Sequence, residues 1–325
     1  MQDATENFDV DLADLPKGEW LTRLAKATDK AGFFQPLGRK HFAALVRRSD
    51  TLLVTFETIQ GIRALSDDAE PVGWPMVRAH GWSHLCVASD GDTWFRDRHV
   101  IGLFDRMIDD GFFDDFETIL FYGAGPGGYA AAAFSVAAPG ARVLAIQPQA
   151  TLDPRVTEWD DRFVEMRRTD FTSRYGFAPD MLDASAAAYV VHDPAERLDA
   201  MHAALFARSG VSHFRMRNMG AALQSDLMDL EMLEPLMEQA MAGALTDLSF
   251  AQAYRARRTY PPYLRRVMAA LDAAERTDLT YALARNVTSR IKAPRFQRRM
   301  AEIEAQRKLA AENSDAAEAE DVTGD

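Results

Sequence analysis

The stretch FYGAGPGGYAAAAF at residues 121–134 decides the fold, because a glycine-rich turn in it joins strand-like residues to a helix-like run of alanines. Gly123, Gly125 and Gly128 satisfy the G-x-G-x-x-G pattern of dinucleotide-binding loops. Gly123, Gly125 and Gly127 also match the G-x-Nu-x-G pattern of a hydrolase nucleophile elbow, in which Nu is the nucleophile. The surrounding sequence has to distinguish the two patterns.

Short apolar runs of strand length recur on both sides of this turn. They are continuous rather than alternating, which is typical of strands buried on both faces of a parallel sheet. Helix-like segments lie between them, and GFFQPLG with HFAALVRR is expected to add an antiparallel pair at the edge. The sequence therefore predicts a doubly wound, mostly parallel α/β sheet. The apolar runs are TLLVTFE (51–57), HLCVAS (84–89), TILFYG (118–123), RVLAIQPQ (142–149), AAYVVHD (187–193) and VSHFRMR (211–217).

We expect three regions along the chain. Residues 1–245 form the α/β domain, with a cap-like excursion over 154–185, where charged and aromatic residues interrupt the alternation of strands and helices. Residues 246–308 form a basic helical appendage, since 251–308 hold 14 Arg or Lys and 5 Asp or Glu. Residues 309–325 carry six acids and no base, and this acidic tail is expected to be disordered.

Composition narrows the class of protein. With 325 residues, of which 47% are hydrophobic, the chain can bury a large core, and its net charge of −12 argues against nonspecific nucleic-acid binding. The sequence shows no secretory signal and no apolar run of membrane-spanning length, so a cytoplasmic location is expected. A single cysteine, Cys86, excludes an internal disulfide, and His80 and His84 are not spaced for a metal pair, so neither a metal nor a cofactor is expected.

The dinucleotide interpretation lacks its supporting residue. A dinucleotide loop normally follows the first strand of its domain and is followed about 20 residues later by an acid that binds the ribose. Here at least two strand-like runs precede the glycines, and Gln147 and Gln149 occupy the end of the next strand. A nucleotide-dependent enzyme with a Rossmann-type loop therefore remains only a further alternative.

The elbow interpretation fits the position of the turn, which is preceded by a buried strand and followed at once by a helix of small residues. The stretch resembles α/β-hydrolase-like proteins whose elbow is Y-G-S-S-M-G-G-Y-A-A, a group often found near bacterial surface-polysaccharide or secretion functions. The resemblance extends over roughly residues 50–240 and is most specific at Tyr122, Gly123 and 127–130. It implies an α/β-hydrolase fold, in which the VVHDP segment delivers the acid of the catalytic triad.

This chain departs from the family pattern at three catalytic positions. Where the family has its nucleophilic serine stands Gly125, which has no hydroxyl. The next residue, which donates its backbone N–H to the oxyanion in this family, is Pro126 and has none. The resemblance places Asn218 at the position of the catalytic histidine, with His213 as the nearby rescue candidate, and Asp193 at the position of the acid.

Several residues are candidates for a ligand site. Glu57 ends a strand at the carboxyl edge, where open α/β sheets bind ligands. Gly125, Gly127 and Gly128 either let the helix approach the sheet or leave free N–H groups for an anion. Asp193 completes this set, unless it only caps the turn that follows it.

We therefore expect a catalytically degenerate α/β-hydrolase-like protein that binds or scaffolds an anionic or glycan-like ligand, in a surface-polysaccharide or export pathway as the resemblance implies. The alternative is an active hydrolase or transferase that uses Asp193, Glu57 or His213 on a bound water. The basic helices are expected to pack on the acidic body or to contact a protein partner. A polyanion contact through their tyrosines is a further possibility, and nucleic acid is not expected.

Overall fold

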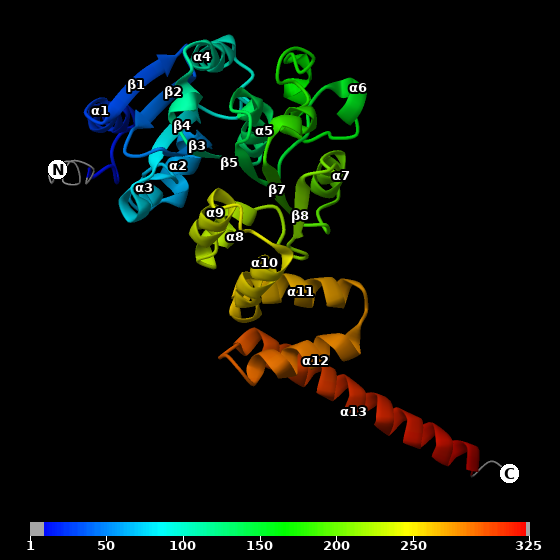
Figure 1. The fold of residues 1–325 in the computed structure, drawn as a ribbon. Helices are drawn as coiled ribbons and strands as arrows, with labels where there is room; N and C mark the ends of the chain where they lie inside the picture. The colour runs from blue at the N-terminus through cyan, green and yellow to red at the C-terminus, as the bar shows by residue number, and fades with distance from the viewer. Residues whose placement is uncertain (1–9, 323–325) are drawn as a thin grey trace. The chain divides into compact units, whose positions relative to one another are not determined.

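The computed structural model describes residues 10–322, and a single sheet of eight strands organises the first of its two parts (Figure 1). The strand order is β1-β2-β4-β3-β5-β6-β7-β8. Strand β2 runs antiparallel to β1 and β4, and the remaining pairs are parallel. The strands are β1 (Gly32–Leu37), β2 (His41–Val46), β3 (Thr51–Thr58), β4 (Ser83–Ser89), β5 (Thr118–Ala124), β6 (Arg142–Ile146), β7 (Ala187–His192) and β8 (Val211–Arg215).

This arrangement is the α/β-hydrolase fold, and it confirms the predicted mostly parallel sheet with an antiparallel pair at its edge. The six predicted apolar runs coincide with β3 to β8. Strands β3 to β7 lie inside the sheet and are largely buried, which favours apolar residues along them, whereas β8 is an edge strand that exposes Ser212 and Arg215. Strand β6 ends earlier than the run that predicts it, at Ile146. The following residue, Gln147, takes a positive φ of 48°, which turns the chain out of the sheet.

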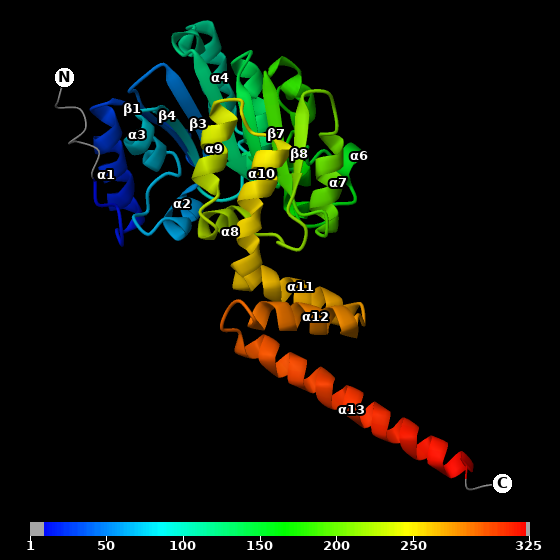
Figure 2. The same ribbon diagram turned by 60° about the horizontal axis from the view of Figure 1, so that its bottom comes forward.

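Helices cover both faces of the sheet. On one face α4 and α5 pack through stacked aromatic rings, with Phe134 lying 5.5 Å from Phe56 and 4.5 Å from Phe104 between ring centroids. On the other face α1 and α3 bury Trp20 and Trp74, and α9 packs on β5 and β6 (Figure 2). The bounds are α1 (Lys17–Asp29), α2 (Ile59–Leu65), α3 (Trp74–His80), α4 (Arg98–Asp109), α5 (Pro126–Phe134), α7 (Arg197–Leu205), α8 (Leu223–Asp229), α9 (Leu233–Met241) and α10 (Asp247–Ala253).

The segment between β6 and β7 consists of short helical turns packed on α5 and α7. The Tyr129 hydroxyl of α5 donates to the Tyr175 carbonyl oxygen at 2.7 Å, and His202 of α7 pairs with Asp160 at 2.9 Å. These buried hydrogen bonds fix the segment on the body. Its elements are α6 (Pro154–Thr157), η4 (Val164–Arg168) and η5 (Ala178–Ala184), while η2 (Phe112–Asp115) and η3 (Ser135–Ala137) lie before β5 and β6.

The chain divides into two compact units between Ala253 and Tyr254, so α10 belongs with the sheet. The second unit contains η6 (Tyr254–Thr259), α11 (Pro261–Ala273), α12 (Thr277–Thr288) and α13 (Pro294–Val322). Its own small core is formed by Leu264, Met268, Ala284, Val287, Ala293 and Phe296.

Helix α13 continues through residues 309–322, a segment whose acidic composition predicts disorder. Alanine and glutamate dominate this segment, and both are strong helix formers, so the same composition is compatible with a helix. Residues 323–325 lie outside the described residues. Across 10–322 the structure contains no helix that combines the length and the apolar character needed to cross a bilayer.

Candidate functional site

The turn between β5 and α5 has the backbone of a nucleophile elbow. Gly125 lies between the strand and the helix with φ 54° and ψ −120°, and its N–H donates to the Ile146 carbonyl oxygen at 2.8 Å. A side chain is strained in this conformation, which is the sharp strand-to-helix turn that displays the nucleophile in α/β-hydrolases. A Cβ placed on Gly125 would meet no atom within 4 Å. The position that a nucleophile would occupy is therefore open, and glycine offers it no reactive group.

The neighbouring glycines are required by close backbone approach. A Cβ on Gly123 would lie 2.1 Å from the Gly127 carbonyl oxygen, and a Cβ on Gly127 would lie 2.2 Å from the Phe56 carbonyl oxygen. At Gly128 the nearest atom, the Ile146 carbonyl oxygen, would be 3.0 Å away. This geometry accounts for all three glycines by packing alone.

Pro126 begins α5, directly after the position of the missing nucleophile. Proline fits the first turn of a helix because its fixed φ suits that position and its missing N–H would be unpaired there. The same missing N–H removes one donor of an oxyanion hole, since the residue after the nucleophile supplies it in this fold. The turn therefore has a favourable helix start and offers no backbone N–H at Pro126.

Asp193 follows β7 and is completely buried. Its carboxylate accepts hydrogen bonds from backbone N–H groups. Oδ1 accepts from Ala195 N at 2.7 Å and from Asn218 N at 3.1 Å, and Oδ2 accepts from Gly220 N at 2.7 Å. The residue at the position of the triad acid thus holds the loop after β8 in place. Asn218 adopts a positive φ of 63° in that loop, and its amide side chain is no base at neutral pH.

His213 lies on β8, three strands away from β5, which corresponds to about 14 Å at 4.8 Å per strand. Its ring packs edge-on against the His192 ring at 5.8 Å between centroids, and burial lowers the pKa of both histidines. The structure therefore places the rescue candidate away from the elbow turn.

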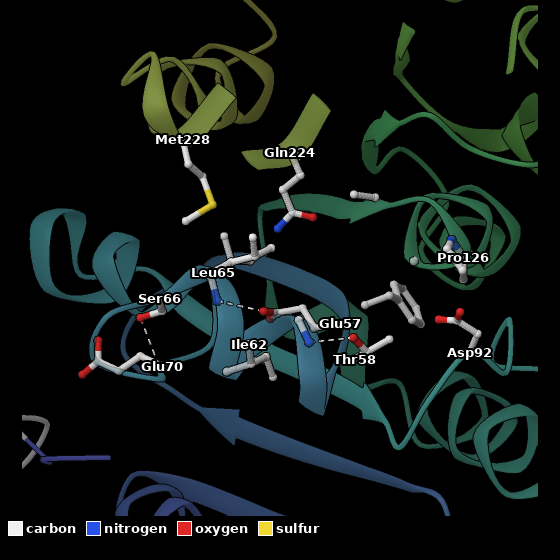
Figure 3. A pocket seen from close by; sticks show the side chains of 15 residues that line it. Glu57, Thr58, Ile62, Leu65, Ser66, Glu70, Asp92, Pro126, Gln224 and Met228 are labelled. Atoms are coloured by element: carbon white, nitrogen blue, oxygen red, sulfur yellow. Dashed lines mark hydrogen bonds between the residues drawn. The ribbon is translucent and has the colours of Figure 1, made fainter. Parts of the chain in front are cut away.

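A cavity of about 240 Å³ lies beside the elbow at the carboxyl edge of β3 and β5 (Figure 3). Its lining contains the carboxylates Glu57, Glu70 and Asp92, and it contains no lysine, arginine or histidine. Figure 3 shows the Glu57 carboxyl in the middle of this lining, with Asp92 and Pro126 to one side. The residues that line the cavity are Phe56, Glu57, Thr58, Gly61, Ile62, Leu65, Ser66, Glu70, Val72, Asp92, Ala124, Pro126, Gly127, Gln224 and Met228.

Three donors hold the Glu57 carboxyl in one orientation. The Thr55 hydroxyl donates to Oε1 at 2.6 Å, the Cys86 thiol contacts the same oxygen at 3.5 Å, and Val72 N donates to Oε2 at 3.0 Å. Burial of the carboxyl raises the pKa of Glu57, and these hydrogen bonds lower it by less. Glu57 is therefore a rigid carboxyl that gives up its proton less readily than an exposed glutamate.

His84 extends the buried hydrogen-bond network of Glu57 through Thr55. His84 Nε2 lies 2.9 Å from the Thr55 hydroxyl oxygen, and burial lowers the pKa of His84 to about 3. The Thr55 hydroxyl gives its one hydrogen to Glu57, so the neutral His84 ring donates from Nε2 to Thr55. Tyr122 lies in register with Thr55 on β5, and burial together with the charge of Glu57 raises the pKa of its hydroxyl.

The two histidines of the GWPMVRAHGWSH stretch are separated in the structure. His84 is buried in β4 beside Thr55, whereas His80 is partly exposed and lies 3.0 Å from Glu238. Among the described residues, no group of three or more His, Cys, Asp or Glu side chains is arranged to hold a metal ion.

At the end of β6, where a dinucleotide-binding protein would place its acid, this chain has two glutamines whose side chains are already hydrogen-bonded within the protein. Gln147 donates to Asp199 Oδ2 at 2.8 Å and accepts from Leu223 N at 2.9 Å, and Gln149 accepts from the Trp94 indole at 3.1 Å. Both side chains hold loops together, and neither is free to bind a ribose.

Of the predicted ligand-site residues, Glu57 and Gly127 line the cavity, and Glu57 was chosen on the rule that ligands bind at the carboxyl ends of parallel strands. Asp92, which follows β4 at the same edge, obeys that rule too and was missed. Gln224 and Met228 come from α8, more than 160 residues from Glu57 in the chain, and no local sequence pattern predicts that they line the cavity.

No protein-family model and no curated protein matches the sequence. Among solved structures, the chain is similar to a glycosylation-associated protein complex (Gap123) from Streptococcus agalactiae, with 12% identity and a TM-score of 0.41 over 61% of this chain and 44% of that one. It is similar to Est1E from Butyrivibrio proteoclasticus, with 14% identity and a TM-score of 0.40 over 64% of this chain and 98% of that one.

A capsule O-acetyltransferase of Neisseria meningitidis serogroup A is similar at 12% identity, with a TM-score of 0.37 over 60% of this chain and 91% of that one. The chain spans less than half the length of the Gap123 chain it matches. At such low identities and TM-scores, the fold rests on the strand order, and these names describe those proteins alone.

Proposed function

We propose that this protein binds a small polar ligand in the cavity beside its elbow and performs no serine-hydrolase chemistry. The observation that carries the proposal is the turn at Gly125, which keeps the strained backbone of an elbow while presenting no nucleophile. Pro126 removes a donor from the oxyanion hole, and the Asp193 carboxylate already accepts hydrogen bonds from three backbone N–H groups. Three separate parts of a serine-hydrolase site are thus unsuited to that reaction.

The lining favours a hydroxyl-rich or amine-bearing ligand over an anion. Glu57 and Asp92 provide acceptors, while Glu70 is already paired with Arg78 at 2.6 Å. A ligand carboxylate or phosphate would meet like charges with no cation among the lining residues to offset them. Of the two ligand classes that the sequence suggested, we therefore keep the glycan-like one. A volume of about 240 Å³ equals that of about eight water molecules at 30 Å³ each, which is room for a single sugar ring.

The biological setting is part of the proposal. A role in surface polysaccharide or export, in the cytoplasm and with a protein partner on the basic helices, rests on the elbow sequence and the charge pattern of the chain. The cavity chemistry is compatible with that setting because glycans present the hydroxyl donors that carboxylates accept.

Thermal unfolding in the presence of three probes tests the ligand class. We expect glucosamine, and more weakly its neutral N-acetyl derivative, to raise the melting temperature, and we expect glucuronate to have no effect. Glu57→Gln should abolish the shift, while Glu165→Gln, a change at an exposed glutamate outside the cavity, should preserve it. A shift with glucuronate alone would refute the proposed ligand class.

A second candidate function is hydrolysis or transfer with Glu57 as the acid or base. It is favoured by the raised pKa of Glu57 and by the fixed orientation that Thr55 and Val72 impose, since general acid–base groups are tuned in this way. The test is turnover of p-nitrophenyl esters and glycosides by the wild type and both glutamine variants. We expect none; turnover that Glu57→Gln removes and Glu165→Gln retains would establish the enzyme instead.

A further inference from the structure

The second unit carries a strongly basic surface where η6, the end of α12 and the start of α13 meet. The Arg290 guanidinium ties these segments together, because Nη1 donates to the Arg258 carbonyl oxygen at 3.1 Å and Nη2 donates to Asn286 Oδ1 at 2.8 Å. Neither acceptor is a carboxylate, so the charge of Arg290 is not neutralised. We call this region the basic end; its exposed cations are Arg255, Arg258, Arg285, Arg290, Lys292, Arg295 and Arg298.

The basic end is built from sequence without acids. Residues 248–271 and 279–301 contain no Asp or Glu. Outside the basic end, Arg299 pairs with Asp272 at 3.0 Å and Arg307 pairs with Asp278. Among the residues that the structure describes, no cation of the basic end forms an ion pair, so this positive charge is available to a partner.

The first unit offers an acidic surface of matching kind. A hollow of about 570 Å³, which we call the acidic hollow, has Leu65, Leu233 and Met228 among its lining residues. Its lining contains no lysine, arginine or histidine. The exposed acids around it are Asp67, Asp68, Glu231, Glu234 and Glu238.

We propose that the basic end of one copy docks on the acidic hollow of a second copy. At physiological salt the Debye length is about 8 Å, so the repulsion between two chains of net charge −12 is screened while close pairs of opposite charge still attract. If the two copies are related by a two-fold axis, both contacts form at once and reinforce each other.

Other partners of a basic surface fit the molecule less well. A nucleic acid would be repelled by the first unit, whose acids outnumber its bases. A membrane surface calls for apolar side chains beside the cations, and the large apolar residues near the basic end are buried in the core of the unit, as Phe296 and Val287 are. The acidic hollow supplies closely spaced carboxylates, and binding to it requires no insertion of apolar side chains.

The oligomeric state of the full chain tests the proposal. Light scattering after size exclusion should give a dimer at physiological salt that dissociates as more salt is added. Arg295→Glu with Arg298→Glu should raise the dissociation constant at least about tenfold, because each change replaces an attraction by a repulsion. The matched control is Arg276→Glu with Lys308→Glu, which alters the net charge equally at exposed sites outside the basic end and should leave the dimer intact.

A charge swap makes the test decisive. Glu231→Lys with Glu234→Lys should also dissociate the dimer. An equimolar mixture of this variant with Arg295→Glu and Arg298→Glu should reassociate, because one contact is then native and the other has both charges reversed. A wild type that is monomeric at physiological salt, or a mixture of folded variants that stays monomeric, overturns the proposal. So does a monomeric wild type that binds RNA through Arg295 and Arg298.

Discussion

The carboxyl ends of β5 and β3 are neighbours in the sheet, yet one carries a strained turn without a side chain and the other a fixed carboxyl. Phe56 and Gly123 are register partners, so Gly125 and Glu57 lie at the same edge. The end of β5 has a strained backbone with no side chain, whereas the end of β3 has a carboxyl on ordinary strand backbone, fixed by three donors. The close backbone contacts of Gly123 and Gly127 thus hold the conformation of the turn without any side chain at Gly125.

The largest effect is expected where the two ends touch. Gly127→Ala places a Cβ 2.2 Å from the Phe56 carbonyl oxygen, a backbone atom that can move only with β3. We expect a loss of about 3 kcal/mol in the free energy of unfolding, measured by urea titration. Gly18→Ala is the control, because a Cβ there meets nothing within 4 Å, and it should change stability by less than about 0.5 kcal/mol. Equal stability of the two variants would show that packing does not preserve the turn.

Gly125→Ser restores the missing hydroxyl and tests whether the backbone alone makes a catalyst. The positive φ of 54° should cost about 1–2 kcal/mol of stability. Ester hydrolysis should remain at background, because Pro126 still supplies no N–H and Asn218 accepts no proton. Gly210→Ser is the matched control, since Gly210 also has a positive φ and open space at its Cβ. Hydrolysis by the Gly125 variant alone would contradict our view of the site.

The sheet was predictable because it depends on patterns within single segments. Strands buried on both faces are apolar nearly throughout, and this marks β3 to β7 without reference to the rest of the chain, whereas the edge strand β8 carries exposed Ser212 and Arg215. The antiparallel edge pair follows from two short runs joined by a tight turn. Helix α13 was harder to predict, since alanine and glutamate suit both a disordered tail and a helix.

The cavity was predictable only in part, because it depends on contacts between distant segments. The edge rule identifies Glu57, but its donors Val72 and Cys86 lie 15 and 29 residues further along the chain. The neutral ring of His84 and its bond to Thr55 follow from burial, which no local pattern reveals. The sequence places Asp193 directly after β7. Its hydrogen bonds could not be predicted, because two of its three backbone donors belong to the loop after β8.

A smaller effect is expected at the residue after Glu57. Thr58 caps α2, because its Oγ1 accepts from Gly61 N at 2.9 Å. Thr58→Ala should lower the free energy of unfolding by about 1 kcal/mol, the usual cost of losing an N-cap, as followed by urea titration. Thr58→Ser keeps the hydroxyl and should retain most of that stability. If both variants lose the same stability, the cap does not hold the end of β3.

The smallest effect is a pH dependence at Glu57. Because burial raises the pKa of Glu57 above its usual 4.5, the folded protein binds more protons than the unfolded chain between these two values. The wild type therefore loses stability as the pH rises through that window, and Glu57→Gln, which does not titrate, avoids this loss. The free energy of unfolding of the variant minus that of the wild type should increase from about pH 4.5 and level off above the raised pKa.

Urea titrations at a series of pH values measure this difference, with Glu165→Gln as the control that should show no such trend. The buried groups that face Glu57, His84, Cys86 and Tyr122, are present in both proteins, so their own titrations cancel from the difference. A difference that falls with rising pH would mean that Thr55, Val72 and Cys86 outweigh burial and hold Glu57 ionised. The end of β3 would then carry a permanent charge, which would strengthen the expected preference for an amine-bearing ligand over a neutral sugar.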